Sequence, residues 1–221
     1  MASGTERSLS TDQLFARAKK HLSLDVPPAL TDPNIMPYFV DRDTNPALIA
    51  AIAAVRPVRT AAVLVPVVER EEPTVLFTTR TSQLADHGGE VSFAGGKIDP
   101  LDANPAAAAL REAEEEIGLD RRFIDPIGYL DVQAVPTGYR ILPTVARVRE
   151  GFSLRFNPGE VTDVFEVALS FLMTPGNYKR ESADWNGLRT SVYAVRFGEH
   201  NIWGVTAGIL WNLRERIHGA R

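Results

Sequence analysis

The chain has 221 residues, of which 44% are hydrophobic, and this is enough for one sizeable core without a second full domain. Its formal net charge of −4 argues against a general nucleic-acid binder, because such a surface would be basic. The absence of cysteine excludes disulfides, a cysteine nucleophile and a zinc site with cysteine ligands.

The N-terminal region predicts helices and no chemistry. We expect residues 1–56 to form a partly disordered extension and residues 57–221 to form the main domain. Within the extension, residues 11–22 predict a helix with an apolar side, and residues 46–55 predict an alanine-rich helix that Pro57 ends. The first helix could equally serve the interface of a homodimer.

We expect no targeting signal in this sequence. The longest apolar runs are far shorter than a membrane span, so we expect no membrane partner. The N-terminus has no charged leader followed by an apolar core, which is the pattern of a secretory signal. A soluble cytoplasmic protein is the resulting expectation.

Two strands are expected next. Residues 61–68 and 74–79 are almost continuously apolar, and a polar turn at 69–73 separates them. Such runs are typical of a sheet that is covered on both faces. Further along, residues 127–130 and 141–148 predict two more strands.

The C-terminal part predicts helices. A short helix begins near Ser170 and ends before Pro175. Residues 202–213 predict a closing helix with Val205, Ile209 and Leu213 directed inward, and its two tryptophans are interpreted as core residues.

A short helix with an acidic last turn stands at the centre of the sequence. Asn104 suits the N-cap, Pro105 suits the first helical position, and Gly118 suits the left-handed residue that ends a helix. The expected core-facing stripe of this helix consists of Ala106, Leu110, Ala113 and Ile117.

Glu112, Glu115 and Glu116 occupy another side of the same helix. Each pair of like charges three or four residues apart costs roughly 0.2–0.5 kcal/mol, and anions in the last turn also oppose the helix dipole. Arg111 can offset part of this cost by reaching Glu114 or Glu115. One interpretation is a solvated acidic face. The other is a bound hard cation, because Mg²⁺ prefers oxygen ligands.

The glycine turn before this helix completes a longer motif. Gly95-Gly96, an acidic loop and the run REAEEEIGL at residues 111–119 resemble the Nudix box, the signature of hydrolases that cleave a nucleoside diphosphate linked to another moiety. The usual box has a Glu six residues after its first Gly and eight before the Arg. Here Asp102 stands six residues after Gly96 and nine before Arg111, so the loop is one residue longer.

The resemblance implies the α+β Nudix fold, an α/β/α sandwich around a mixed β-sheet, to which the N-terminal helical extension is added. It also implies Mg²⁺ or Mn²⁺ as cofactor. The implied metal ligands are Glu112, Glu115, Glu116 and the carbonyl of Gly96. Arg111 is implied to hold one of these glutamates in place.

Residues 76–96 narrow the resemblance. The pattern Leu-Phe-Thr-x-Arg, followed by Leu-x-x-His-x-Gly-x-Val-x-Phe-x-Gly-Gly, is similar to the motif ahead of the Nudix box in coenzyme A pyrophosphatases. That subfamily also tolerates the longer acidic loop, but it normally has Pro where Ala94 stands. The whole resemblance covers roughly residues 61–213.

The resemblance implies a substrate site that includes Gly95 and Gly96, with Arg80 and His87 near the coenzyme A adenosine or its 3′-phosphate. An arginine suits a phosphate because its fork of donors binds oxygens bidentately. Other interpretations remain open. Arg80 could pair with Glu90 or be a solvated charge on an edge strand, and His87 could be a structural or surface histidine.

A further carboxylate follows the box. Residues 156–167 resemble an Asn-Pro-x-Glu-Val segment of coenzyme A-type Nudix enzymes, in which a loop carboxylate approaches the metals. Glu160 is therefore expected to be an extra ligand or the base that orients or deprotonates water. Glu115 is the other candidate base, and a capping or surface role is the alternative for Glu160.

The implied reaction splits coenzyme A, or its acyl or oxidised forms, into 3′,5′-ADP and 4′-phosphopantetheine. The implied partner is thus a small molecule. The alternatives are a Nudix pyrophosphatase for another nucleoside diphosphate derivative, such as NADH or ADP-ribose, and a Nudix protein that only senses a nucleotide.

Overall fold

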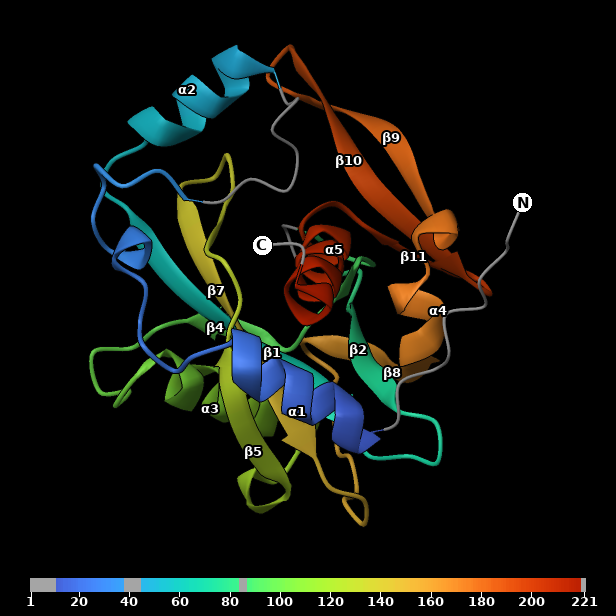
Figure 1. Ribbon diagram of the computed structural model, residues 1–221. Helices are drawn as coiled ribbons and strands as arrows, with labels where there is room; N and C mark the ends of the chain where they lie inside the picture. Colours follow the sequence, from blue (N-terminus) through green and yellow to red (C-terminus); the bar gives the residue numbers. More distant parts are fainter. Residues whose placement is uncertain (1–10, 38–44, 84–86, 220–221) are drawn as a thin grey trace.

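The computed structural model describes residues 11–37, 45–83 and 87–219, and these residues form an α/β/α sandwich (Figure 1). The predicted disorder of residues 1–10 lies outside this part of the chain. The helices are α1 (Thr11–His21), α2 (Pro46–Ala54), α3 (Pro105–Ile117), α4 (Leu169–Met173) and α5 (Gly204–His218), and the short 3-10 turns are η1 (Pro28–Leu30), η2 (Arg121–Phe123) and η3 (Pro175–Asn177).

The larger sheet of the described residues has eight strands, β1 (Arg59–Val68), β2 (Thr74–Arg80), β3 (Val91–Ser92), β4 (Gly95–Lys97), β5 (Ile124–Tyr129), β6 (Gln133–Ala134), β7 (Tyr139–Val148) and β8 (Val161–Ala168). Its main order is β3-β2-β1-β7-β5, with β4 paired to β1, β6 to β7 and β8 to β2. Strands β1 and β7 run parallel, and the other pairs are antiparallel. The predicted mixed sheet is confirmed.

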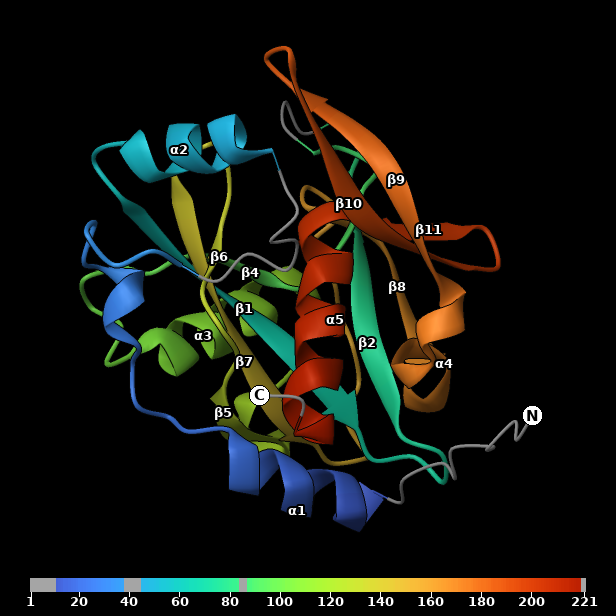
Figure 2. The same ribbon diagram turned by 45° about the horizontal axis from the view of Figure 1, so that its top comes forward.

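Strand β1 serves both layers of the sandwich. Val65 and Val67 pack into a cluster with side chains of α1 and α5, whereas Ala62 and Leu64 pack into another cluster with α3. Successive strand residues point to opposite faces, so one apolar strand supplies both cores. In Figure 2, α5 lies in front of the sheet and α3 lies behind it.

The N-terminal helix is part of the main core. As predicted, α1 has an apolar side, and its buried residues are Leu14, Phe15 and Ala18. They belong to the same cluster as Leu213 and Ile217 of α5. The chain's own last helix therefore covers the apolar side of α1. The homodimer stays a prediction. The division into 1–56 and 57–221 stays a prediction.

A second, three-stranded sheet was not predicted. It consists of β9 (Tyr178–Trp185), β10 (Leu188–Phe197) and β11 (His200–Trp203), in the order β11-β10-β9. The turn between β9 and β10 is Asn186-Gly187, and both residues have positive φ, at 50° and 81°. This dipeptide is a strong hairpin signal in a sequence, so the hairpin could have been predicted.

Three predictions for the C-terminal helix are wrong. Helix α5 begins two residues later than predicted, because β11 continues to Trp203. Ile209 and Leu213 are buried as predicted, but Val205 is 38% exposed since it lies in the first turn, beyond the apolar cluster. Trp203 is 37% exposed because strand alternation turns it away from the core. Trp211 is half-buried and stacks on a tyrosine of β10.

Candidate active site

Strand β4 brings two glycines against β1. Gly95 pairs with Val63 and Gly96 with Ala62. A Cβ atom on Gly95 would lie 2.6 Å from the Cα of Val63, and one on Gly96 would lie 2.6 Å from the carboxyl carbon of Glu112. The first glycine thus permits close strand packing, and the second leaves room for a carboxylate.

Helix α3 forms as its sequence predicts. The side chain of Asn104 accepts a hydrogen bond from the Ala107 amide at 2.9 Å, Pro105 is the first helical residue, and Gly118 ends the helix with φ of 65°. Of the predicted core stripe, Leu110 is only half-buried, whereas Glu116 is buried among the apolar residues. The helix therefore carries a carboxylate into its packed side.

The three glutamates of α3 differ sharply in exposure. Glu116 is 4% exposed, whereas the side chain of Glu112 is 17% exposed and that of Glu115 is 57% exposed. Helical spacing places Glu115 and Glu116 on either side of Glu112. Only Glu112 and Glu116 therefore face the interior.

The buried carboxylates are electrostatically unfavourable. Burial raises the pKa of Glu116 to about 8, assisted by the charges of Glu160 and Glu112 and opposed by Arg80 and by a hydrogen bond from the Gly95 amide. Burial also raises the pKa of Glu112, although the Arg111 guanidinium opposes this shift. A cation at this position would favour the ionised forms.

Arg111 joins the outer carboxylates into one network. Its guanidinium donates to both oxygens of Asp102 at 3.0 Å, to Glu112 at 2.8 Å, to Glu115 at 3.1 Å and to the Lys97 carbonyl at 3.1 Å. Asp102 has only 7% of its side chain exposed. The predicted role of Arg111 in holding a glutamate agrees with these contacts.

Asp102 also closes the longer loop. Its Oδ2 accepts a hydrogen bond from the Asp99 amide at 2.8 Å, and Arg111 lowers the pKa of Asp102. Leu101 at the tip of the loop is 94% exposed, so the additional residue is accommodated outward. The Asp102 side chain is shorter than the usual Glu, but it still contacts Arg111.

Two groups from other elements approach the buried glutamates. The loop before β8 carries Glu160, whose Oε1 accepts a hydrogen bond from Asn157 at 3.0 Å and whose carbonyl accepts one from the Thr81 amide at 2.8 Å. Arg80, the last residue of β2, is close enough to influence Glu116, and its buried Nε has no hydrogen-bond partner among the described residues. The structure therefore brings Arg80 and Glu160 to the acidic helix.

His87 lies apart from this group. Its side chain is 63% exposed, and its Nδ1 lies 2.9 Å from a carboxylate oxygen of Glu90. Within the described residues, no hydrogen bond or ion pair joins His87 to the glutamates of α3. Glu90 also pairs with His87 and not with the Arg80 side chain.

The donor set fits a hard divalent cation. Glu112, Glu116 and Glu160 supply carboxylate oxygens that repel one another across a partly buried space, and the Gly96 backbone lies beside Glu112. In the part of the chain that the structure describes, three acidic or histidine side chains do not already converge as a metal site. Arg111 instead binds Glu112 and Glu115.

The family model described as NUDIX domain matches residues 58–185, which contain the glycine strand, the acidic helix and Glu160. The chain belongs to the Nudix family. Nudix proteins act on small nucleotide substrates and generally use divalent metal ions. The predicted class of Nudix hydrolase is therefore confirmed, together with its fold.

Two relatives with Nudix names are similar to most of this chain, and one solved structure is similar to it at low sequence identity. "Uncharacterized Nudix hydrolase NudL" of Photorhabdus laumondii subsp. laumondii is 38% identical over 159 residues, which are 72% of this chain and 85% of the relative. The protein of the same name from Escherichia coli strain K12 is 37% identical over 72% of this chain and 83% of the relative. A MutT/nudix family protein from Enterococcus faecalis is 12% identical, with a TM-score of 0.48 over 81% of this chain and 72% of that chain.

Sequence reasoning missed two supports of this Nudix site. The side-chain amide of Asn157 donates to the Glu160 carboxylate. The backbone N–H of Asn157 donates to the Glu116 carbonyl at 2.8 Å, so Asn157 links the loop to the end of α3. Asp102 was noticed only as an irregular spacing. Its signal was the acidic residue kept at the usual distance from the glycine turn despite the longer loop.

Separately, no helix in the described ranges has the length and apolar character needed to cross a membrane.

Proposed function

We propose that this Nudix hydrolase cleaves the pyrophosphate bond of coenzyme A or its derivatives, giving 3′,5′-ADP and 4′-phosphopantetheine. The observation that carries the reaction type is the pair of inward-facing carboxylates, Glu112 and Glu116, beside the glycine strand, with the charges of Arg80 and Glu160 close enough to influence Glu116. The motif at residues 76–96 supports the coenzyme A class of substrate.

Glu112 and Glu116 are the proposed firm metal ligands, with the Gly96 carbonyl beside them. Bound Mg²⁺ or Mn²⁺ would neutralise the pyrophosphate oxygens and acidify the attacking water. Glu115 is the outermost member of the predicted set, because it is exposed and paired with Arg111. We therefore assign it a weaker contribution, through water or through Arg111.

Glu160 is the proposed base. It approaches Glu112 and Glu116, and Asn157 fixes its carboxylate. The water oxygen forms a new bond to one phosphorus while the bond from that phosphorus to the bridging oxygen breaks. The water proton passes to Glu160, and the bridging oxygen leaves on the other phosphate. Glu115 is less suited to this task because it faces away from the buried pair.

Arg80 is the proposed substrate-binding cation. Its position near Glu116 suits an oxygen of the pyrophosphate, since a guanidinium fork binds phosphate oxygens bidentately. Contact of Arg80 or His87 with the adenosine or the 3′-phosphate stays a prediction.

The test is a substrate panel. The purified protein is incubated with coenzyme A, NADH or ADP-ribose, with and without Mg²⁺ or Mn²⁺, and the products are separated by chromatography. We expect metal-dependent formation of 3′,5′-ADP from coenzyme A. Preferential AMP release from NADH or ADP-ribose would assign the site to another dinucleotide, and binding without products would make the protein a sensor.

A further inference from the structure

The outer edge of strand β9 is unpaired in the part of the chain that the structure describes. Strand β9 has eight residues, lies at one end of the three-stranded sheet and pairs with β10 in a register without a shift. In both Figure 1 and Figure 2 the β9–β10 hairpin projects at the edge of the molecule. The strand therefore presents backbone N–H and C=O groups that another strand can bind.

Alternate residues of β9 direct these groups outward. Asp184 faces Arg189 of β10, and the Arg189 carbonyl accepts a hydrogen bond from the Asn45 side chain at 3.3 Å, so it points away from β9. In an antiparallel pair, the backbone groups of two facing residues point either toward each other or both away. Asp184 therefore directs its N–H and C=O outward, and so do Ser182 and Arg180 at two-residue steps.

The other sheet edges of the described residues carry features that oppose strand pairing. Strands β5 and β8 lie at edges of the larger sheet, each has a register shift against its neighbour, and β5 also contains Pro126. Strands β3 and β11 are only two and four residues long. Strand β9 is longer than these two and has neither a proline nor a bulge, so only its charged side chains control which strand can join it.

The order of charges along β9 favours one register with a second copy of the same strand. Two identical antiparallel strands pair about a central residue, and a register centred on Ser182 places Arg180 opposite Asp184 of the second copy, twice by symmetry. A register centred on Glu181 or Arg180 would place like charges directly opposite each other, which is destabilising. A register centred on Ala183 would bring no opposite charges together. Only the register centred on Ser182 is thus matched in charge without a repulsive pair.

The side chains of Arg180 and Asp184 are placed to meet in this register. They lie on the same face of the strand, because they are separated by two two-residue steps. The guanidinium of Arg180 lies over the Tyr193 ring, 4.5 Å from its centroid, and this contact holds it on that face. Asp184 accepts a hydrogen bond from the Gly187 amide at 3.0 Å, and a carboxylate has further acceptor sites for a guanidinium.

We propose that two copies of this chain associate through their β9 edges, antiparallel and centred on Ser182, so that their three-stranded sheets form one continuous sheet. Arg180 of each copy pairs with Asp184 of the other, and on the opposite face Lys179 lies against Trp185, where a cation–π contact is favourable. The outward backbone groups form about six hydrogen bonds. The predicted homodimer then needs no surface of α1, and the proposal does not depend on the reaction.

The first test measures the oligomeric state of the full chain. Native protein, Arg180→Asp, Asp184→Arg and the double exchange are compared by analytical ultracentrifugation at several concentrations, with circular dichroism to confirm the fold. Arg196→Asp is the matched control, since Arg196 is exposed on β10. We expect a dimer for the native chain and the control, and about tenfold weaker association for each single variant. The double exchange should restore the dimer, because it restores both pairs of opposite charge.

Two outcomes of this experiment would overturn the proposal. A native chain that is monomeric would leave the β9 edge to a strand of another protein. A dimer that all variants form equally would place the interface elsewhere on the molecule.

The second test examines the register. The chain has no cysteine, so Ser182→Cys and Ala183→Cys each supply a single thiol. The proposed register places residue 182 opposite itself at a Cα–Cα distance of about 5.5 Å, which a disulfide can span, whereas Ala183 lies opposite Glu181. After mild oxidation, non-reducing electrophoresis should show a cross-linked dimer for Ser182→Cys and about tenfold less for Ala183→Cys. Equal cross-linking of both variants, or of neither, would refute this register.

Discussion

The acidic residues around α3 have an outer side, formed by Asp102 and Glu115, and an inner side, formed by Glu116. The two sides differ in how their negative charges are balanced. On the outer side, Arg111 satisfies Asp102 and Glu115 through direct hydrogen bonds. On the inner side, burial raises the pKa of Glu116, and Arg80, whose charge opposes this shift, makes no ion pair with it in the described part of the chain. The charges of the outer side are therefore balanced within the protein, whereas those of the inner side would be balanced by the proposed cation.

The largest effect is expected when the buried carboxylate of the inner side is removed. Glu116→Gln should lower turnover by about a thousandfold, because a bound metal contributes several kcal/mol to the transition state and about 1.4 kcal/mol corresponds to tenfold. Metal-dependent hydrolysis kinetics measure this loss, and circular dichroism should show an intact fold. Glu114→Gln is the matched control, since Glu114 pairs with Arg121 away from the cluster. Unfolding of Glu116→Gln would instead make this residue structural.

The stability of the metal-free protein should reveal the same unpaired charge. The pKa of Glu116 is about 8 in the fold and 4.5 as its ordinary value, so the folded state binds more protons between these values. Stability should therefore fall as pH rises from 4.5 to 8, by on the order of a few kcal/mol. Urea unfolding in a chelator at pH 5.5 and 8.5 measures the change. Glu116→Gln should reduce the difference, and an equal difference in both proteins would contradict the assignment.

A smaller effect is expected when Asp102, which binds Arg111 on the outer side, is changed. Asp102→Asn removes one of the three charged partners of Arg111, and loss of an outer partner of a metal site typically costs 10–100-fold in affinity or activity. We expect a decrease of this size in kcat/KM and a higher metal concentration for half-maximal activity. Wild-type values for both quantities would show that the loop does not position Arg111.

The smallest effect is expected at Glu115. Its ion pair with Arg111 is exposed, and such pairs contribute about 0–1 kcal/mol. Glu115→Gln should therefore lower kcat/KM by less than about fivefold under the assay used for Glu116→Gln. A loss as large as that of Glu116→Gln would place Glu115 among the firm ligands or make it the base, and the contrast between the two sides would fail.

Local sequence signals predicted the centre of the site well. Asn104, Pro105 and Gly118 each act through their own backbone preference, so the bounds of α3 could be read from the sequence. The ranking of Glu112, Glu115 and Glu116 could not, because it depends on β4 and on the loop that carries Glu160. Helical spacing shows which residues are neighbours, and it does not show which neighbour another element will cover.

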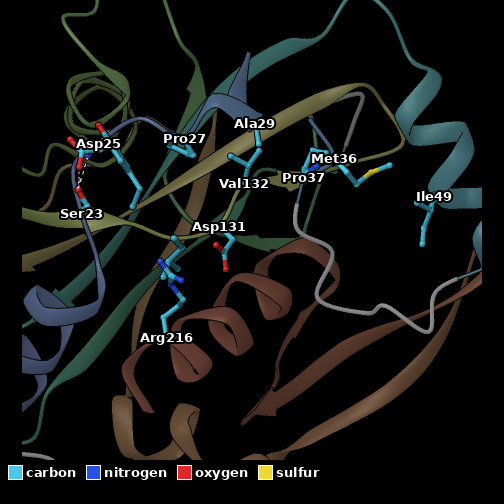
Figure 3. Close-up of a pocket in the computed structure, with 12 residues that line it drawn as sticks. Ser23, Asp25, Pro27, Ala29, Met36, Pro37, Ile49, Asp131, Val132 and Arg216 are labelled. Atoms are coloured by element: carbon cyan, nitrogen blue, oxygen red, sulfur yellow. Dashed lines mark hydrogen bonds between the residues drawn. The ribbon is translucent and has the colours of Figure 1, made fainter. Parts of the chain in front are cut away.

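The flanking regions were predicted less well. The β9–β10 hairpin was missed although Asn186-Gly187 marks its turn, and Trp203 was assigned to the core because a strand residue was counted as helical. A cavity of about 600 Å³ lined by Ser23, Ile49, Asp131 and Arg216 (Figure 3) had no sequence signal, because only the tertiary fold brings these distant residues together.

The packing of α1 on α5 has a practical consequence for shortened versions of this protein. Both helices lie outside the residues that the family model matches. A chain trimmed to begin near residue 57 would keep every acidic residue of the site, yet it would expose Leu213 and Ile217 to water. We expect such a fragment to aggregate, since large bare apolar patches promote self-association. Crystallisation trials should therefore retain the chain from Thr11 onward.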